Sequence, residues 1–169
     1  IPDDHPFVQQ QVKKAMDAFV SGKAMYVAPH GSHRLFRYGD KFEGAYFLVK
    51  GTDEAPIIIY FVRYSRVKIK KGLLNTKNAL RQVLVWRRKD LSIGAQSVAK
   101  CVFFNYLLPE FGALVTDTQQ TERGKAFWDY AIAQALEKEL VVSVINTKRQ
   151  ASQVVRSTEE FENLDTSIW

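Results

Sequence analysis

The feature of this sequence that most restricts its fold is an apolar run that stops at polar residues and leads into a helix. The run covers residues 113–115, Thr116 and Asp117 follow it, and an amphipathic pattern then continues to Glu139. A strand that ends in hydroxyl and carboxylate groups places them at the carboxyl end of a sheet, where open α/β sheets bind ligands. The segment 82–108 repeats the strand-then-helix order. The two units predict a β-α-β-α core.

Around this core the sequence predicts one helix and several antiparallel strands. A helix begins near Pro6, carries apolar residues at helical spacing as far as Val20 and ends at Ser21-Gly22. After it, β-branched and aromatic residues stand between turns rich in Gly, Pro and Asp, which is typical of hairpins. The predicted strands are residues 24–28, 33–38, 44–49, 56–71, 82–87 and 113–115, and a closing hairpin of 140–145 with 152–156. The predicted core helices are residues 93–108 and 121–139.

The expected fold is therefore α+β or α/β, with a mixed, mostly antiparallel sheet, a β-α-β-α-β-β second half and one N-terminal helix. A chain of 169 residues has the size of one domain. Residues 1–81 would supply the helix and antiparallel strands, 82–156 the core and 157–169 an acidic tail. The single cysteine, Cys101, excludes an internal disulfide and fits a reducing compartment, so we expect a cytoplasmic protein.

Basic residues gather in one part of the chain. The net charge is +6, and the span from Ala55 to Lys89 contains ten basic residues and no acidic one. Such asymmetry suggests an anionic partner: nucleic acid, a nucleotide or an acidic protein. Strand alternation over 56–71 places aromatic rings and cations on one face, the combination that binds single-stranded nucleic acid. The predicted nucleic-acid contacts are Tyr60, Tyr64, Arg66, Lys68 and Lys70. The alternative is a solvated basic strand face.

Two histidines, His30 and His33, flank Gly31 and suggest a metal site at first sight. No acid or cysteine stands near them to complete a ligand set. We therefore interpret them as turn histidines and expect no metal site.

From Gln82 onward, the order of elements resembles the GNAT superfamily of N-acetyltransferases. In that family a central strand leads into a turn of the pattern Gln/Arg-x-x-Gly-x-Gly/Ala. Backbone N–H groups of the turn and of the following helix hold the pyrophosphate of acetyl-CoA. Here the motif falls on residues 89–94, with Lys89 as the leading residue, Ser92 at the first glycine and Gly94 at the second.

The resemblance implies acetyl-CoA, or another acyl-CoA, as the cofactor. The pantetheine arm would lie along the backbone of the strand before the turn, and the phosphates would lie at the turn and its cations. The implied cofactor contacts are Val83, Val85, Trp86, Arg88, Lys89, Ser92, Ile93, Gly94 and Ala95.

A second family signature, Asn-x-x-Ala-x-x-x-Tyr, marks the next strand-to-helix junction, and its tyrosine protonates the leaving thiolate. The same spacing here gives Thr121, Gly124 and Trp128, and tryptophan has no phenolic proton to donate. The implied activity is acyl transfer from acyl-CoA to an amine. Its candidate catalytic residues are Asp117 as the base, Glu122 behind it and Tyr130 as a substitute acid. For Asp117 a helix-capping role is the structural alternative.

Two other functions stay open at this stage. One is a basic nucleic-acid-binding module on the same scaffold without chemistry, and the other is an inert interaction domain. The first is compatible with acyl transfer if the acceptor is nucleic acid or a protein bound to it. Stabilisation by CoA would favour the enzyme, and oligonucleotide binding with a steep salt dependence would favour the binding module.

Overall fold

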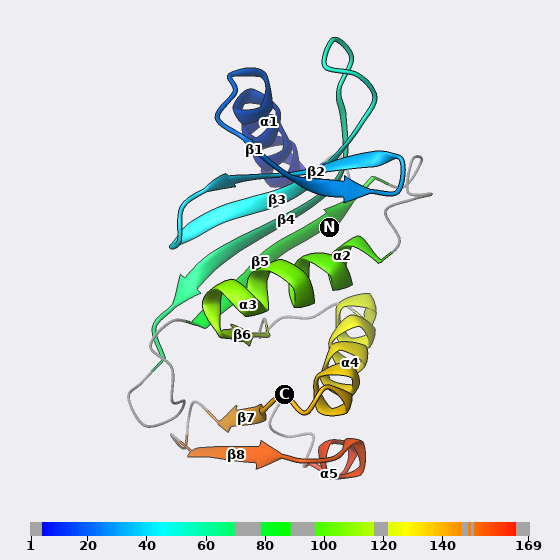
Figure 1. Cartoon of the computed structure of the whole chain (residues 1–169). Helices are drawn as coiled ribbons and strands as arrows, with labels where there is room; N and C mark the ends of the chain where they lie inside the picture. Colours follow the sequence, from blue (N-terminus) through cyan, green and yellow to red (C-terminus); the bar gives the residue numbers. More distant parts are fainter. Residues whose placement is uncertain are drawn as a thin grey trace. The chain divides into compact units, whose positions relative to one another are not determined.

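The computed structural model of the chain describes residues 5–69, 79–88, 97–116, 122–146, 149 and 151–164. These residues form two compact units. The first unit contains the N-terminal helix, a six-stranded sheet and the helix that joins its last two strands. The second contains a long helix, a β-hairpin and a short helix (Figure 1).

The sheet of the first unit keeps the strands in chain order, β1-β2-β3-β4-β5-β6. The strands are β1 (Met25–His30), β2 (His33–Gly39), β3 (Glu43–Lys50), β4 (Ile57–Val67), β5 (Ala79–Arg87) and β6 (Ala113–Val115). Neighbours from β1 to β5 are antiparallel, whereas β5 and β6 are parallel. The fold is therefore α+β with a mixed, mostly antiparallel sheet and an N-terminal helix, as the sequence predicts.

The parallel pair is joined by a crossover helix, because parallel neighbours cannot be joined by a tight turn. Three segments follow one another without a break: α2 (Val98–Cys101), the π-helical turn η1 (Val102–Leu107) and α3 (Leu108–Phe111). Pro109 has no N–H to donate to the carbonyl group of Asn105, and the wider π-helical turn just before it accommodates this loss. The helix therefore continues past its predicted end at residue 108. It stops at Gly112, whose φ of 74° is left-handed.

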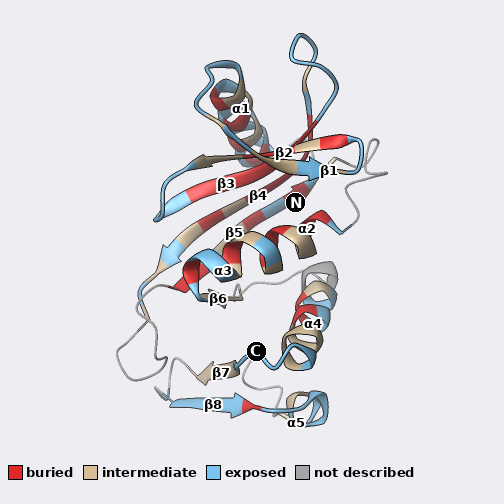
Figure 2. Cartoon of the chain, in the orientation of Figure 1, coloured by how far each residue is buried: buried red, intermediate tan, exposed pale blue. Residues whose placement is uncertain are grey.

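The sheet is covered by helices on both faces, so each face has its own core. On one face, α1 (Pro6–Val20) packs Val8 and Ala15 against a cluster that includes Phe47 and Phe61. On the other face, the crossover helix contributes Val102, Leu107 and Phe111 to a second cluster. The sheet contributes Tyr46, Leu48, Tyr60, Val62 and Tyr64 to it. The central strands β3 and β4 are buried on both sides (Figure 2). This double burial explains their continuous apolar runs.

The second unit is built around α4 (Glu122–Glu137), which is followed by β7 (Val142–Asn146), β8 (Ala151–Val155) and α5 (Thr158–Glu162). β7 and β8 form the predicted antiparallel hairpin, as a sheet of their own. Trp128 and Ala131 are buried on α4.

The short helix α5 lies in the segment that the sequence suggests only as an acidic tail. The Ser157 Oγ accepts a hydrogen bond from the Glu160 N–H (3.1 Å), and the Glu160 carboxylate accepts one from the Arg156 N–H (2.7 Å). Such reciprocal bonds cap a helix start, and Glu159 and Glu160 favour the positive end of its dipole. The pattern Ser-Thr-Glu-Glu is the signal that would have predicted this helix.

One glycine of the sheet is required by a neighbouring ring. A Cβ at Gly44 would lie 2.4 Å from the Tyr64 Oη and 2.5 Å from the Tyr38 carbonyl oxygen, so the tyrosine would have to move. We expect Gly44→Ala to lower the free energy of unfolding, measured by chemical denaturation, by about 3 kcal/mol through overpacking and lost hydrogen bonds.

The matched control is Gly31→Ala. Gly31 has a φ of 59° but open space around its would-be Cβ, so only backbone strain, about 1 kcal/mol, should appear. A cost at Gly44 no greater than the cost at Gly31 would contradict the close approach of Tyr64.

Candidate functional site

The first candidate site lies where β5 separates from β6. The two strands pair only at Ala79 with Ala113, Leu80 with Leu114 and Arg81 with Val115. β5 then continues for six more residues, to Arg87. Within the described part of the chain, no strand pairs with this edge over residues 82–87. The edge therefore offers backbone N–H and C=O groups to an extended ligand.

A β-bulge lies at the same place on the other side of β5. Arg63 pairs with Leu84 and Tyr64 with Gln82, which leaves Val83 as the extra residue. Bulges bend a strand and redirect its side chains, and they are frequent next to active sites.

The bulge sets which face each following side chain of β5 takes. Val85 stands opposite Val62 and so shares the face of the crossover helix, yet Val85 is 46% exposed whereas Val62 is fully buried. An apolar side chain is thus left open beside the unpaired strand edge. Trp86 points to the other face and is buried in the core beneath α1. Its side chain therefore does not face a ligand at the edge.

The remaining cofactor residues expected from the resemblance follow directly in the chain. Arg87 is exposed, and Arg88 donates its backbone N–H to the Ile59 carbonyl group (3.0 Å), which fixes the end of the strand. Lys89, Ser92, Ile93, Gly94 and Ala95 lie outside the described residues.

The expected catalytic residues are not brought together by what the structure describes. Asp117 lies outside the described residues. Glu122 begins α4, and its side chain is outside the described part. Tyr130 is 38% exposed on α4, and Trp128 is buried beside Phe127, with the two rings edge to face and their centroids 5.5 Å apart. Trp128 is therefore a core residue of the second unit.

The expected nucleic-acid face on β4 is only partly exposed. Tyr60 and Tyr64 are 2% and 0% exposed, so the prediction that their rings are open to stacking is wrong. Strand alternation identified the shared face correctly but could not show that the crossover helix covers it. Burial raises the pKa of both phenols, so they stay protonated at neutral pH. Arg66 and Lys68, beyond the helix, are exposed, and Lys70 lies outside the described residues.

At this end of β4 a polar network links the sheet to α3. The Arg37 guanidinium donates to the Tyr64 Oη (3.1 Å) and pairs with the Glu110 carboxylate (2.5 Å). It also lies 5.6 Å from the centre of the Tyr46 ring. Burial opposes the charge on Arg37, but the hydrogen bond to Glu110 and the nearby Tyr64 and Tyr46 hydroxyls leave its pKa raised. The Tyr64 hydroxyl donates onward to the Asp40 carbonyl group (3.1 Å).

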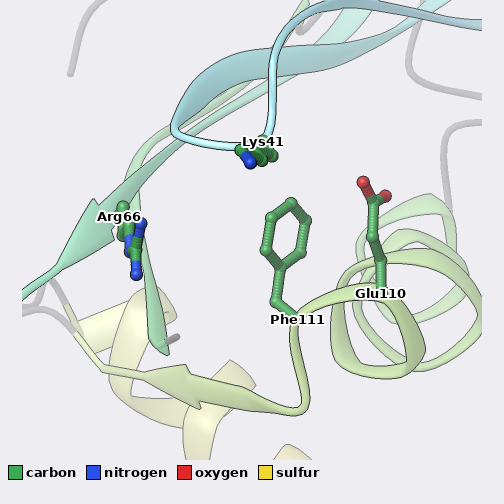
Figure 3. Close-up of a pocket in the computed structure, with 4 residues that line it drawn as sticks. All are labelled: Lys41, Arg66, Glu110 and Phe111. Atoms are coloured by element: carbon green, nitrogen blue, oxygen red, sulfur yellow. The ribbon is translucent and has the colours of Figure 1, made fainter. Parts of the chain in front are cut away.

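Beside this network lies a pocket of about 380 Å³ lined by Lys41, Arg66, Glu110 and Phe111 (Figure 3). Lys41 comes from the β2–β3 turn, Arg66 from the end of β4, and the other two from α3. Figure 3 shows the Phe111 ring below Lys41, with Arg66 on one side of the ring and the Glu110 carboxylate on the other. The sequence does not reveal this pocket, because its walls come from three segments that are far apart in the chain, at Lys41, at Arg66, and at Glu110 and Phe111.

The turn that carries Lys41 is held by the Asp40 carboxylate and by β4. The Asp40 Oδ1 accepts hydrogen bonds from the N–H groups of Phe42 (2.7 Å) and Glu43 (2.9 Å). These two bonds favour the carboxylate and lower the pKa of Asp40. The Arg66 N–H donates to the Phe42 carbonyl group (2.7 Å), which ties the turn to β4. A Gly-Asp turn followed by a cation and an aromatic residue was the available sequence signal.

No protein-family model matches the chain, and neither a curated protein nor a solved structure matches it. None of the described helices is long and apolar enough to cross a membrane. Among the described residues, no three His, Cys, Asp or Glu side chains come together as a metal site, and His33 is buried.

The ion pair between Arg37 and Glu110 should contribute measurably to stability. Arg37 is only 15% exposed at its side chain and Glu110 36%. We expect a double-mutant cycle with Arg37→Met and Glu110→Gln, followed by chemical denaturation, to give a coupling of about 1–2 kcal/mol.

The control cycle uses Lys13→Met and Asp17→Asn, an ion pair on α1 whose side chains are 76% and 63% exposed. Its coupling should stay near 0.3–0.5 kcal/mol because water screens it. Equal couplings in the two cycles would show that Arg37 does not anchor the crossover helix.

Proposed function

We propose that the chain is an acyl-CoA-dependent N-acyltransferase of the GNAT type, which transfers an acyl group to an amine. The observation that carries this proposal is the separation of β5 from β6, which leaves the edge of β5 at residues 82–87 without a strand partner among the described residues. The β-bulge at Val83 lies on the same stretch. The order of elements around it, strand, crossover helix, parallel strand and helix, is the order that led to the resemblance.

The open edge suits the pantetheine arm of an acyl-CoA. This arm is an extended chain with two amide groups, which can hydrogen-bond to a strand edge as an additional strand would. The exposed Val85 side chain would contact its methylene groups. Arg87 and Arg88 stand at the end of β5, and the residues that follow, 89–95, are those to which the resemblance assigns the pyrophosphate. Guanidinium groups there would add charge-assisted hydrogen bonds to the phosphates.

The reaction would be direct transfer. The lone pair of the acceptor amine attacks the thioester carbonyl carbon, a C–N bond forms, the C–S bond breaks, and CoA leaves as a thiolate. The amine loses one proton and the thiolate takes one up. We assign the removal of the amine proton to Asp117, with Glu122 as the second candidate, and protonation of the thiolate to Tyr130. Most of the acceleration would come from holding the amine and the thioester in position.

Thermal unfolding in the presence of CoA tests the cofactor site. CoA at a hundred times its Kd should stabilise the parent by about 2.7 kcal/mol, which raises Tm by roughly 5–10 °C. Val85→Trp should abolish the shift because the indole fills the strand edge. Gly94→Trp should do the same if the turn holds the pyrophosphate.

Met25→Trp is the matched control, since Met25 is also exposed on a strand, at the opposite edge of the same sheet. This variant should keep the full shift. No shift for the parent, or an undiminished shift for Val85→Trp, would refute a cofactor site at β5.

A further inference from the structure

An exposed aromatic ring at the β2–β3 turn has two cations close to it. Phe42 is 44% exposed, unlike the buried phenylalanines of the sheet. The Lys41 ammonium lies 5.2 Å and the Arg66 guanidinium 5.1 Å from the centre of its ring. The Asp40 carboxylate and the backbone bond from Arg66 hold the turn in this shape. The ring and its cations are thus presented on a defined backbone.

The charge around the adjoining pocket is positive. Lys41 and Arg66 line it, and its one carboxylate, Glu110, is paired with Arg37. Its lining therefore carries two cations and one carboxylate that is already paired with Arg37. Phe111 provides an apolar wall in a pocket of about 380 Å³, which lies within the range of small-ligand sites. Such a pocket suits a flat apolar group attached to an anion.

The two cations beside the Phe42 ring come from different elements. Lys41 lies in the β2–β3 turn and Arg66 near the end of β4. The span from Ala55 to Lys89, which includes Arg66, contains no acidic residue. Neighbouring cations of this kind favour a polyanion over a single small anion.

We infer that Lys41, Phe42 and Arg66 form a binding surface for single-stranded nucleic acid. The cations would contact successive phosphates, one base would stack on Phe42, and a neighbouring base would enter the pocket against Phe111. Rings beside cations are the features by which proteins hold single strands without reading sequence. An acidic peptide would use the cations but has no flat bases for the ring and the pocket. This site is separate from the edge of β5, and the inference does not depend on acyl transfer.

Fluorescence anisotropy with a labelled oligo-dT of about 12 nucleotides, within the usual size of such sites, tests the inference. Phe42→Ala should weaken binding roughly fivefold or more, the loss of one stacked base. Lys41→Gln and Arg66→Gln should each reduce the slope of log affinity against log salt by about 0.7, the loss of one phosphate contact on a single strand.

Two matched controls lie on α1, over the other face of the sheet. Phe7→Ala removes a ring of similar exposure, 37%, and Lys14→Gln removes one exposed cation. Both should bind as the parent does. Lys41 and Phe42 are exposed, so their variants should also keep the parent Tm, which separates lost binding from lost folding.

Three results would overturn the inference. They are equal losses in the α1 controls, equally tight binding of a duplex of the same length, and competition by polyglutamate as effective as competition by unlabelled oligo-dT. The thermal shift with CoA should be the same for Phe42→Ala and the parent. Failure at this surface can therefore be told apart from failure at β5.

Discussion

The structure of the first unit depends on one strand having two kinds of neighbour. β5 is antiparallel to β4 and parallel to β6. The parallel pairing requires a crossover, and the crossover helix then has to cover one face of the sheet. The helix buries Tyr60 and Tyr64, and its last turn places Glu110 beside Arg37. Because the parallel pairing is short, no described strand pairs with the rest of this β5 edge.

The network of Arg37 shows how a charged side chain is accommodated beneath the crossover helix. Arg37 comes from β2, on a face that is mostly apolar. Its charge is satisfied by Glu110 and Tyr64 and lies over aromatic rings. Burying a charged guanidinium without partners costs free energy, and its hydrogen bonds require acceptors at defined positions. The network therefore favours one position of α3 over others that apolar packing alone would allow.

Most elements were predictable from the sequence because their patterns are local. The N-terminal helix, the hairpins and the strand-helix-strand order follow from periodicity and from turn residues. Burial by a distant segment was not predictable in this way. Tyr60 and Val85 both alternate correctly on their strands, yet one lies under the helix and the other at an open edge. The pocket by Phe42 was missed for the same reason, since Lys41 and Phe111 are far apart in the chain.

The unbroken run from Val98 to Phe111 gives the crossover helix a fixed length. Fourteen residues at the rise of an α-helix span about 20 Å. The helix begins after the segment proposed to hold the phosphates of CoA, and its last residues form a wall of the pocket beside Phe42. Because the helix is continuous, its residues cannot shift independently of one another. A residue inserted between Val98 and Glu110 would therefore move Glu110 away from Arg37 and Phe111 away from the pocket at the same time.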